Sequence, residues 1–268
     1  MALPPPALDS AVLVTGASSG IGVELARELA GRSYNLVLVA RSDEPMHVLA
    51  ADLRAAHGVE VAVHAADLSD AAARDALLAR LSGGPFELVG VCNNAGFGST
   101  GRFVDQPLER EQAMVRVDVE ALHHLTGAFL PRMVAQGTGA ILNVASTAAY
   151  QPVPGMATYA ACKAFVQSFS EAVHAELAGT GVSVTCLSPG PTRTRFGAVA
   201  GLREDGPAAP GFLVADPGPV ARAGIDAMVA GRRSAVPGVS NKLSSAGGRL
   251  VPRTLLLPLA RRIGAPDA

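Results

Sequence analysis

The sequence has few of the residues that mark disulfide-rich, metal-binding or membrane-spanning proteins. It contains no tryptophan and three cysteines, and no two cysteines form a Cys-x-x-Cys pair. Widely spaced thiols fit a reducing compartment and argue against a disulfide or zinc framework. We therefore interpret Cys92, Cys162 and Cys186 as small buried residues and expect no metal site. No apolar run approaches the roughly 18 residues that a membrane span needs.

An excess of charge of one sign is also missing. The 22 basic and 23 acidic residues give a formal net charge of -1, so the composition creates no global field for nucleic acid or an acidic membrane. The first ten residues, MALPPPALDS, lack the basic segment and apolar core of a signal peptide. We expect a cytoplasmic protein that binds no nucleic acid and has no transmembrane segment.

The chain is rich in short apolar runs that alternate with helical patterns, and its 49% hydrophobic content is enough for one large buried core. The runs predict strands at 11–15, 35–40, 59–63, 87–92, 140–145, 182–187 and 234–237, with helices that include 23–31, 44–57, 70–81, 108–136 and 220–230. This alternation predicts an α/β fold with a Rossmann-like, doubly wound parallel sheet of about seven strands, flanked by helices on both faces. We expect a leader over 1–9, one dinucleotide-binding and catalytic domain over 10–237, and an extension over 238–268.

The segment 145–163 (ASTAAYQPVPGMATYAACK) brings a serine, a tyrosine and a lysine close in sequence. Ser146 follows a predicted strand, while Tyr159 and Lys163 are four apart in a helical pattern and therefore share one face. A neighbouring ammonium lowers the pKa of a phenol from its reference value of about 10. Tyr159 is then a candidate acid/base and Ser146 a hydrogen-bond donor to a substrate oxygen. This combination predicts a site that interconverts carbonyl and alcohol groups.

A glycine-rich turn joins the first strand to the first helix. Gly16, Gly20 and Gly22 allow a tight turn and close approach to a phosphate, and the helix amino terminus supplies N–H groups to a pyrophosphate. Ser18 and Ser19 add hydroxyl donors. A glycine loop alone is a weak signal, but its place between a strand and a helix favours a dinucleotide site.

The end of the second strand favours NADP over NAD as the cofactor. NAD-binding proteins usually place an acid about 20 residues past the first glycine, whereas this chain has Arg41 followed by Ser42. A guanidinium suits a ribose 2′-phosphate. NAD remains an alternative, because Asp43 or Glu44 could bind the 2′-hydroxyl.

Polar or small residues follow several other predicted strands. Asp67 is either an adenine contact or a helix cap, and Ser69 and Asp70 compete for the cap. Asparagines of the NNAG motif at 93–96 are expected to tie their strand to its neighbours. The Pro/Gly turn at 188–195 opens a ligand crevice, and 196–219 is interpreted as a flap over it. The tail at 242–263 has three candidate roles: cover for the sheet edge, a subunit contact, or a membrane-surface contact.

With TGASSGIG at 15–22, NNAG at 93–96, Ser146, YAACK at 159–163 and PGPTRT at 189–194, the chain resembles the short-chain dehydrogenase/reductase family over residues 10 to about 237. The resemblance implies a dimer or tetramer and assigns Tyr159 as acid/base, Ser146 as the carbonyl-orienting hydroxyl, and Lys163 as a ligand of the nicotinamide ribose. It also implies cofactor contacts for the motif residues. These are Gly16, Ser18, Ser19, Gly20, Ile21, Gly22, Asp67, Leu68, Asn94, Ala95, Gly96, Pro189, Gly190, Thr192 and Thr194.

The chain departs from this family at one position. Family members usually have an asparagine in a kinked helix, where its main-chain carbonyl holds a water linked to the lysine, and here the matching residue is Asp118. An added carboxylate near Lys163 would alter the pKa of Tyr159. We expect an NADP-dependent oxidoreductase for a small, apolar carbonyl or alcohol substrate. The alternative is an NADP-binding regulatory or scaffold protein with weak or no turnover.

Overall fold

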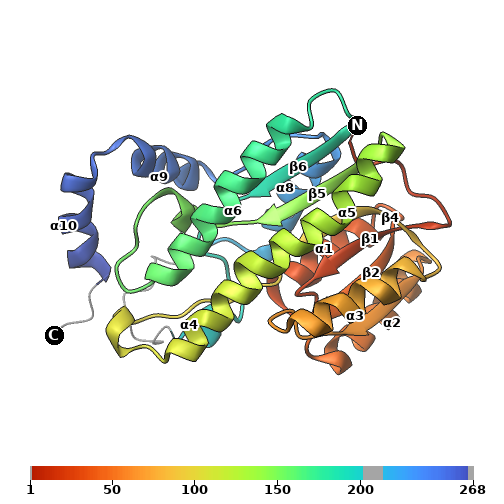
Figure 1. Ribbon diagram of the computed structural model, residues 1–268, viewed down its shortest axis with the longest axis horizontal. Coiled ribbons are helices and arrows are strands. Elements are labelled where there is room, and N and C mark those ends of the chain that lie inside the picture. The colour runs from red at the N-terminus through yellow and green to blue at the C-terminus, as the bar shows by residue number, and fades with distance from the viewer. Residues whose placement is uncertain (1, 202–213, 265–268) are drawn as a thin grey trace.

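The computed structural model describes residues 2–201 and 214–264. Its centre is a parallel seven-stranded sheet in the order β3-β2-β1-β4-β5-β6-β7 (Figure 1). The order reverses beside β1, which is the doubly wound arrangement that the sequence predicted. The strands are β1 (Ser10–Thr15), β2 (Asn35–Ala40), β3 (Val61–Ala65), β4 (Glu87–Asn93), β5 (Gly139–Val144), β6 (Val182–Leu187) and β7 (Ser234–Ala235).

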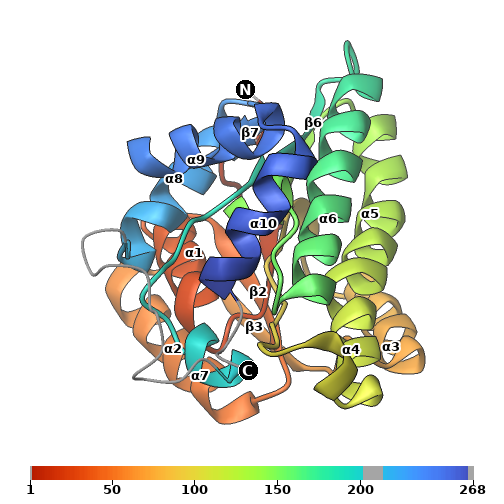
Figure 2. The same ribbon diagram turned by 90° about the vertical axis from the view of Figure 1, so that its left-hand side faces the viewer.

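Helices cover both faces of the sheet. The first half of the chain forms α1 (Gly20–Ala30), α2 (Asp43–His57), α3 (Ala71–Ser82), the short η1 (Phe103–Asp105), α4 (Leu108–Val115), η2 (Arg116–Ala121) and α5 (Leu122–Gln136). The second half forms η3 (Thr147–Tyr150), α6 (Ala157–Glu176), α7 (Phe196–Ala200), α8 (Pro217–Val229), α9 (Val239–Leu250) and α10 (Arg253–Gly264). Figure 2 shows α1, α2 and α8 on one side of the sheet and α3, α5 and α6 on the other.

Two hydrophobic cores follow from the alternation of side chains along each strand. Val12 and Val14 of β1 point into the core shared with α1, α2 and α8. Ala11 and Leu13 point into the opposite core, to which α3 and α5 contribute. Because both faces are covered, every residue of β1 and β2 is buried. The carboxyl ends of these strands are thereby held rigidly along one edge, where the motif residues lie.

For most elements the expected bounds lie within about three residues of the observed ones, and three differences stand out. The third strand begins at Val61 and not at 59, because its ladder with β2 starts opposite Leu36. The helix expected over 108–136 changes to a π-helical turn between 116 and 121. The tail forms two helices, α9 and α10, that extend from one end of the molecule (Figure 1).

The flap expected over 196–219 lies partly outside the described residues. Its first residues form the short helix α7, and Ala215 pairs with Thr192 in an isolated parallel bridge. This bridge fixes the residues just before α8 to the turn that follows β6. Within residues 2–201 and 214–264, no helix is both long enough and apolar enough to cross a membrane.

Candidate active site

The structure brings Ser146, Tyr159 and Lys163 together beyond the carboxyl end of β5. Lys163 reaches back to the strand, where its Nζ donates a hydrogen bond to the Val144 carbonyl at 3.1 Å. The same Nζ lies 5.6 Å from the centroid of the Tyr159 ring. Ser146 accepts a hydrogen bond from the Ala148 N–H at 3.1 Å, which fixes its hydroxyl, and the hydroxyl is near enough to Tyr159 to lower the pKa of the phenol. The predicted catalytic side chains therefore form one buried cluster.

Asp118 is the fourth member of this cluster. Its carboxylate is fully buried, and its Oδ2 lies 3.4 Å from the Nζ of Lys163. Its Oδ1 accepts a hydrogen bond from the Phe97 N–H at 3.1 Å. The π-helical turn η2 carries Asp118, and such turns are frequent at functional sites because they re-aim side chains. The sequence predicted a kink or a buried polar role here; the structure shows the buried polar role and, at this position, a π-helical turn.

The environment of the cluster sets the protonation of its members. Burial, which is the largest effect, raises the pKa of Tyr159, while Lys163 and the Ser146 hydroxyl lower it and Asp118 raises it further. Lys163 thus acts in the expected direction, but the net pKa of Tyr159 is raised and not lowered. Burial, the largest single effect, lowers the pKa of Lys163, but the charges of Asp118 and Tyr159 and the hydrogen bond to Asp118 together outweigh it, and the net direction is upward. Burial likewise raises the pKa of Asp118 against the attraction of Lys163.

The glycine turn has the geometry of a phosphate cradle. Gly16 and Gly20 have φ angles of 66° and 59°, which side chains disfavour. A Cβ at Gly22 would lie 2.2 Å from the carbonyl oxygen of Gly16, so only glycine permits this turn. The hydroxyl of Ser19 makes no capping bond with α1. The main-chain N–H groups from Ser18 to Ile21, at the start of α1, are therefore available to an anionic group.

The NNAG motif is attached to the glycine turn through Thr15. The Thr15 hydroxyl accepts hydrogen bonds from the N–H groups of Asn94 and Ala95, each at 3.0 Å. The Asn94 side chain donates to the Thr15 carbonyl at 2.9 Å, and Asn93 donates to Asn143 of β5 at 2.9 Å. These bonds confirm that asparagines tie β4 to its neighbours. Thr15 was not singled out from the sequence, although it precedes the glycine motif directly.

Residues expected at the adenosine end lie at the ends of β2 and β3. Arg41 is exposed directly after β2, and its charge helps to lower the pKa of Asp67. Burial is the largest single effect and raises the pKa of Asp67. Hydrogen bonds from the Ser69 N–H and hydroxyl to Asp67 Oδ1 act with Arg41 to lower it, and the net direction is downward. The helix cap is Asp70, which accepts from the Ala72 N–H. Leu68 has its side chain in the core, which leaves only its main chain to face a cofactor.

The turn after β6 lies against the glycine turn. The side chain of Thr194 would contact a Cβ at Gly20 at 3.0 Å, so the two loops touch. Thr194 accepts a hydrogen bond from the Phe196 N–H, and Thr192 donates to the Gly190 carbonyl at 2.9 Å. The Pro189 carbonyl accepts from the Thr147 N–H at 2.8 Å, which joins this turn to the Ser146 segment. The nicotinamide-end residues therefore border both the cradle and the catalytic cluster.

Phe196 forms a wall of the site. Its ring lies 5.1 Å from the Tyr159 ring, centroid to centroid, in a tilted arrangement. It also packs so closely on Gly98 that a Cβ there would lie 2.6 Å from the ring. Phe103, by contrast, is 57% exposed. The structure thus places the Phe196 ring on Tyr159, the candidate acid/base.

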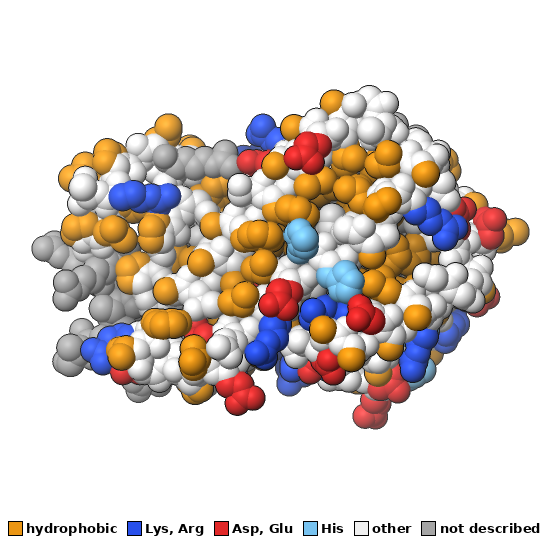
Figure 3. Space-filling model, in the orientation of Figure 1, with side chains coloured by type: hydrophobic (Ala, Val, Ile, Leu, Met, Phe, Trp, Pro, Cys, Tyr) orange, Lys and Arg blue, Asp and Glu red, His pale blue; other side chains and the backbone are white. Residues whose placement is uncertain are grey.

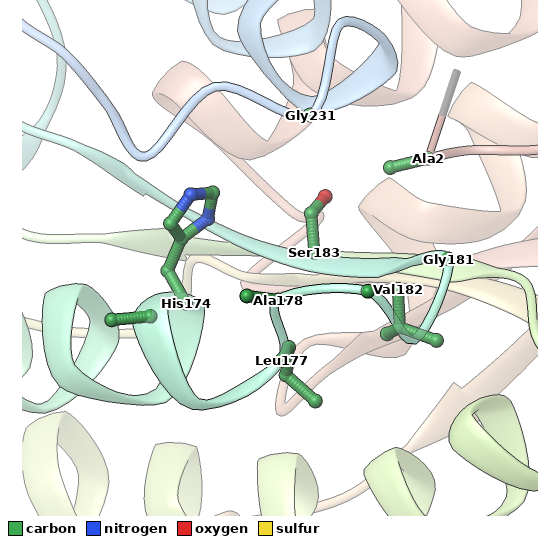
Figure 4. A pocket seen from close by; sticks show the side chains of 10 residues that line it. Ala2, His174, Leu177, Ala178, Gly181, Val182, Ser183 and Gly231 are labelled. Carbon is green, nitrogen blue, oxygen red and sulfur yellow. The ribbon is translucent and has the colours of Figure 1, made fainter.

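A separate pocket of about 370 Å³ lies far from this cluster (Figure 4). It is bounded by the carboxyl end of α6, the start of β6 and Ala2. His174 lines it, but its Nδ1 is already 2.9 Å from the Val184 carbonyl oxygen. The pocket is at the amino end of β6, opposite to the predicted site residues. Among the described residues, no group of three or more His, Cys, Asp or Glu side chains could hold a metal ion.

The fold and site define a doubly wound α/β protein with a Ser-Tyr-Lys cluster beside a glycine-rich turn. A family model described as "short chain dehydrogenase" matches residues 10–204. The chain therefore belongs to the short-chain dehydrogenase family.

Similar proteins include named oxidoreductases. The chain is 36% identical over 199 residues to "Probable oxidoreductase EphD" of Mycobacterium tuberculosis, a match that covers 74% of this chain and 33% of that protein. It is 34% identical over 186 residues to the 7beta-hydroxysteroid dehydrogenase of Collinsella aerofaciens, covering 68% of each. A short-chain dehydrogenase from Sphingobium yanoikuyae in complex with NADPH superimposes with a TM-score of 0.79 at 33% identity, covering 96% of this chain and 99% of that one.

The chain spans about a third of the length of the first of these relatives.

Proposed function

We propose that this protein is an NADP-dependent oxidoreductase that interconverts a carbonyl and an alcohol. The observation that carries the proposal is the cluster beyond β5 in which the buried Tyr159 and Lys163 lie together, with the Lys163 Nζ 5.6 Å from the centroid of the Tyr159 ring, next to Ser146. Ser146 orients the substrate oxygen by hydrogen bonding. In reduction, the Tyr159 O–H bond breaks and its proton passes to that oxygen; in oxidation, the phenolate removes the hydroxyl proton.

The residues present fit a dinucleotide. A cradle in which a Cβ at Gly22 would collide with the Gly16 carbonyl supports a bound pyrophosphate at 16–22. Asn94 to Gly96 would support the adenosine half, Lys163 the nicotinamide ribose, and Thr192 and Thr194 the carboxamide. The bound nicotinamide would supply or accept the hydride that balances the proton transfer. NADPH is present in the similar Sphingobium yanoikuyae structure.

A preference for NADP and for an apolar substrate deepens the same proposal. Arg41 is an exposed cation at the end of β2, where a ribose 2′-phosphate requires one. The wall formed by Phe196 against Tyr159 favours an apolar group next to the reacting carbon. Bulky apolar carbonyl compounds are therefore the first substrates to test.

The experiment measures NADPH oxidation with a panel of ketones and aldehydes. Tyr159→Phe is expected to lose at least about a hundredfold in kcat, since general acid catalysis contributes this much or more, while NADPH binding measured by fluorescence stays. Tyr34→Phe is the matched control, because Tyr34 is equally buried but its hydroxyl bonds to the Pro4 carbonyl. Equal turnover by wild type and Tyr159→Phe would refute the assigned role.

A second candidate follows from Asp118. Its carboxylate lies next to the Lys163 ammonium. If this carboxylate blocks proton transfer to Tyr159, the protein is an NADP-binding regulatory or scaffold protein. NADPH binding without turnover on the whole panel, and no gain in turnover in Asp118→Asn, would support this function over the enzyme.

A further inference from the structure

Helix α9 carries an apolar stripe on its solvent side. Val239, Leu243 and Leu250 are spaced by four and seven residues, which places them on one helical face. Their exposed fractions are 74%, 70% and 82%. In a surface helix of a globular protein, such a stripe normally faces the core.

The opposite face of α9 is polar and small, and it packs on the domain. Asn241 lies so close to Gly190 that a Cβ there would be 2.2 Å from its side-chain oxygen. Gly248 lies against the Tyr150 carbonyl, where a Cβ would approach to 3.0 Å, and Ser245 is 6% exposed. The amphipathic helix is thus turned with its apolar side outward, and its inner side touches the loops of the site.

The apolar surface continues from α9 into α10. Val251 is partly exposed between the two helices, while Leu255 and Leu257 of α10 are 67% and 43% exposed. Figure 3 shows hydrophobic side chains gathered at the end of the molecule that α9 and α10 form in Figure 1. An exposed patch of this kind marks an interaction site.

The charge of this part of the chain differs in sign from the rest. Residues 239–264, which form α9, α10 and the turn between them, contain five of the 22 basic residues and none of the 23 acidic residues. Their formal net charge is +5, against -6 for the other residues of the chain. Lys242 and Arg253 are exposed next to the apolar residues. The surface therefore combines leucines and cations, which suits an apolar boundary that carries negative charge.

We propose that α9 and α10 form a docking surface for a membrane whose exposed leaflet contains anionic lipid. The leucines enter the headgroup boundary and the basic residues pair with the lipid phosphates. A second copy of the chain fits less well, because a two-fold contact would place the same basic segment against itself. Docking would bring the site loops that α9 contacts near the bilayer. The proposal does not depend on the proposed function.

The test measures sedimentation of the full chain with vesicles. Phosphatidylcholine vesicles with about 30% phosphatidylserine are compared with phosphatidylcholine alone, at about 0.05 M and 0.5 M salt. The wild type is expected to bind the anionic vesicles and to dissociate at high salt. The double variant Leu243→Ser/Leu250→Ser should lower the partition coefficient at least about tenfold, and Lys242→Glu at least about fivefold.

Two controls match these changes elsewhere on the surface. Val48→Ser removes an apolar side chain that is 59% exposed on α2, and Arg80→Glu reverses an exposed charge on α3. Both should bind as the wild type does, and circular dichroism checks that every variant is folded. No binding to anionic vesicles at low salt, or binding that the α9 variants leave unchanged, overturns the proposal. A third result also overturns the proposal. If the wild type does not bind vesicles but is a dimer in sedimentation equilibrium, and Leu243→Ser/Leu250→Ser dissociates that dimer, the stripe is a subunit contact.

Discussion

Replacing Asp118 by asparagine is expected to destabilise the fold through Lys163. The substitution keeps the size of the side chain and leaves an oxygen to accept the Phe97 N–H. It removes the negative charge 3.4 Å from the Lys163 Nζ, in a place where both side chains are almost inaccessible to solvent. The remaining ammonium then has the Val144 carbonyl as a hydrogen-bond acceptor but no carboxylate.

The expected loss in the free energy of unfolding is about 3 kcal/mol at neutral pH. Two unit charges 3.4 Å apart attract by about 5 kcal/mol at an effective dielectric constant of about 20. Part of this attraction offsets the cost of burying the charges, and removing one member of a buried pair typically costs about 3 to 5 kcal/mol. The lower value applies here because asparagine retains a dipole beside the ammonium.

The deficit should shrink as the pH rises. Asp118 raises the pKa of Lys163 above 10.5 in the wild type, so this contribution to stability is complete below that value and is lost as the pH rises through the raised pKa. Without the carboxylate, burial is the dominant effect and lowers the pKa of Lys163 below that of the unfolded chain. The variant therefore gains stability relative to the wild type as the pH rises through its lowered Lys163 pKa toward 10.5, the ordinary value for lysine.

Reversible urea unfolding, followed by circular dichroism at one protein concentration, measures these differences. A double-mutant cycle with Lys163→Met should give a coupling energy of about 2 to 3 kcal/mol. The control cycle uses Arg102 and Asp105, whose charged atoms are closer, at 2.6 Å, but exposed, and whose coupling should be far weaker. A coupling energy between Asp118 and Lys163 no larger than that between Arg102 and Asp105 would refute the reasoning. So would a loss of stability in Asp118→Asn that does not change with pH.

Two further predictions concern the cofactor and Tyr159. Arg41→Ala should weaken NADPH binding about tenfold or more while NADH binding stays constant, because a charged hydrogen bond contributes about 1.5 to 3 kcal/mol. Titration calorimetry measures both affinities, with Arg27→Ala as the control variant. An equal loss of affinity for both cofactors would contradict the prediction. In the cofactor-free protein, burial raises the pKa of Tyr159 above 10, so ultraviolet absorption should show no phenolate at neutral pH. If the wild type shows a phenolate signal at neutral pH and Tyr159→Phe removes it, the pKa of Tyr159 is lowered and not raised, which contradicts the prediction.

Much of the fold could be predicted because both faces of the sheet are covered. Strands buried on both sides consist of continuous apolar runs, and the bounds of β2 and β6 were predicted to the residue. The start of β3 could not be predicted, since the apolar Val59 precedes the ladder that Leu36 begins with Val61. The pairing partner set this bound, and a single strand does not reveal its partner.

The site was predictable where one residue type is required and less so where contacts are distant in sequence. Gly16 and Gly22 are demanded by the backbone itself, so the motif pointed to them. The contact of Phe196 with Tyr159 joins residues 37 positions apart and depends on how the turn after β6 folds. The raised pKa of Tyr159 could not be predicted either, because the depth of burial was unknown and it outweighs the effect of Lys163.

Asp118 and Gly96 form a unit that neither residue explains alone. A Cβ at Gly96 would lie 2.7 Å from Asp118 Oδ1 and 3.2 Å from Lys163 Nζ, so the ion pair exists only because the NNAG motif ends in glycine. Asp118 in turn holds the Phe97 N–H directly after that motif. Because the motif is fixed to the glycine turn through Thr15, the carboxylate connects the expected cofactor floor to the lysine beside Tyr159. Its charge therefore acts between the proposed cofactor site and the proposed acid/base.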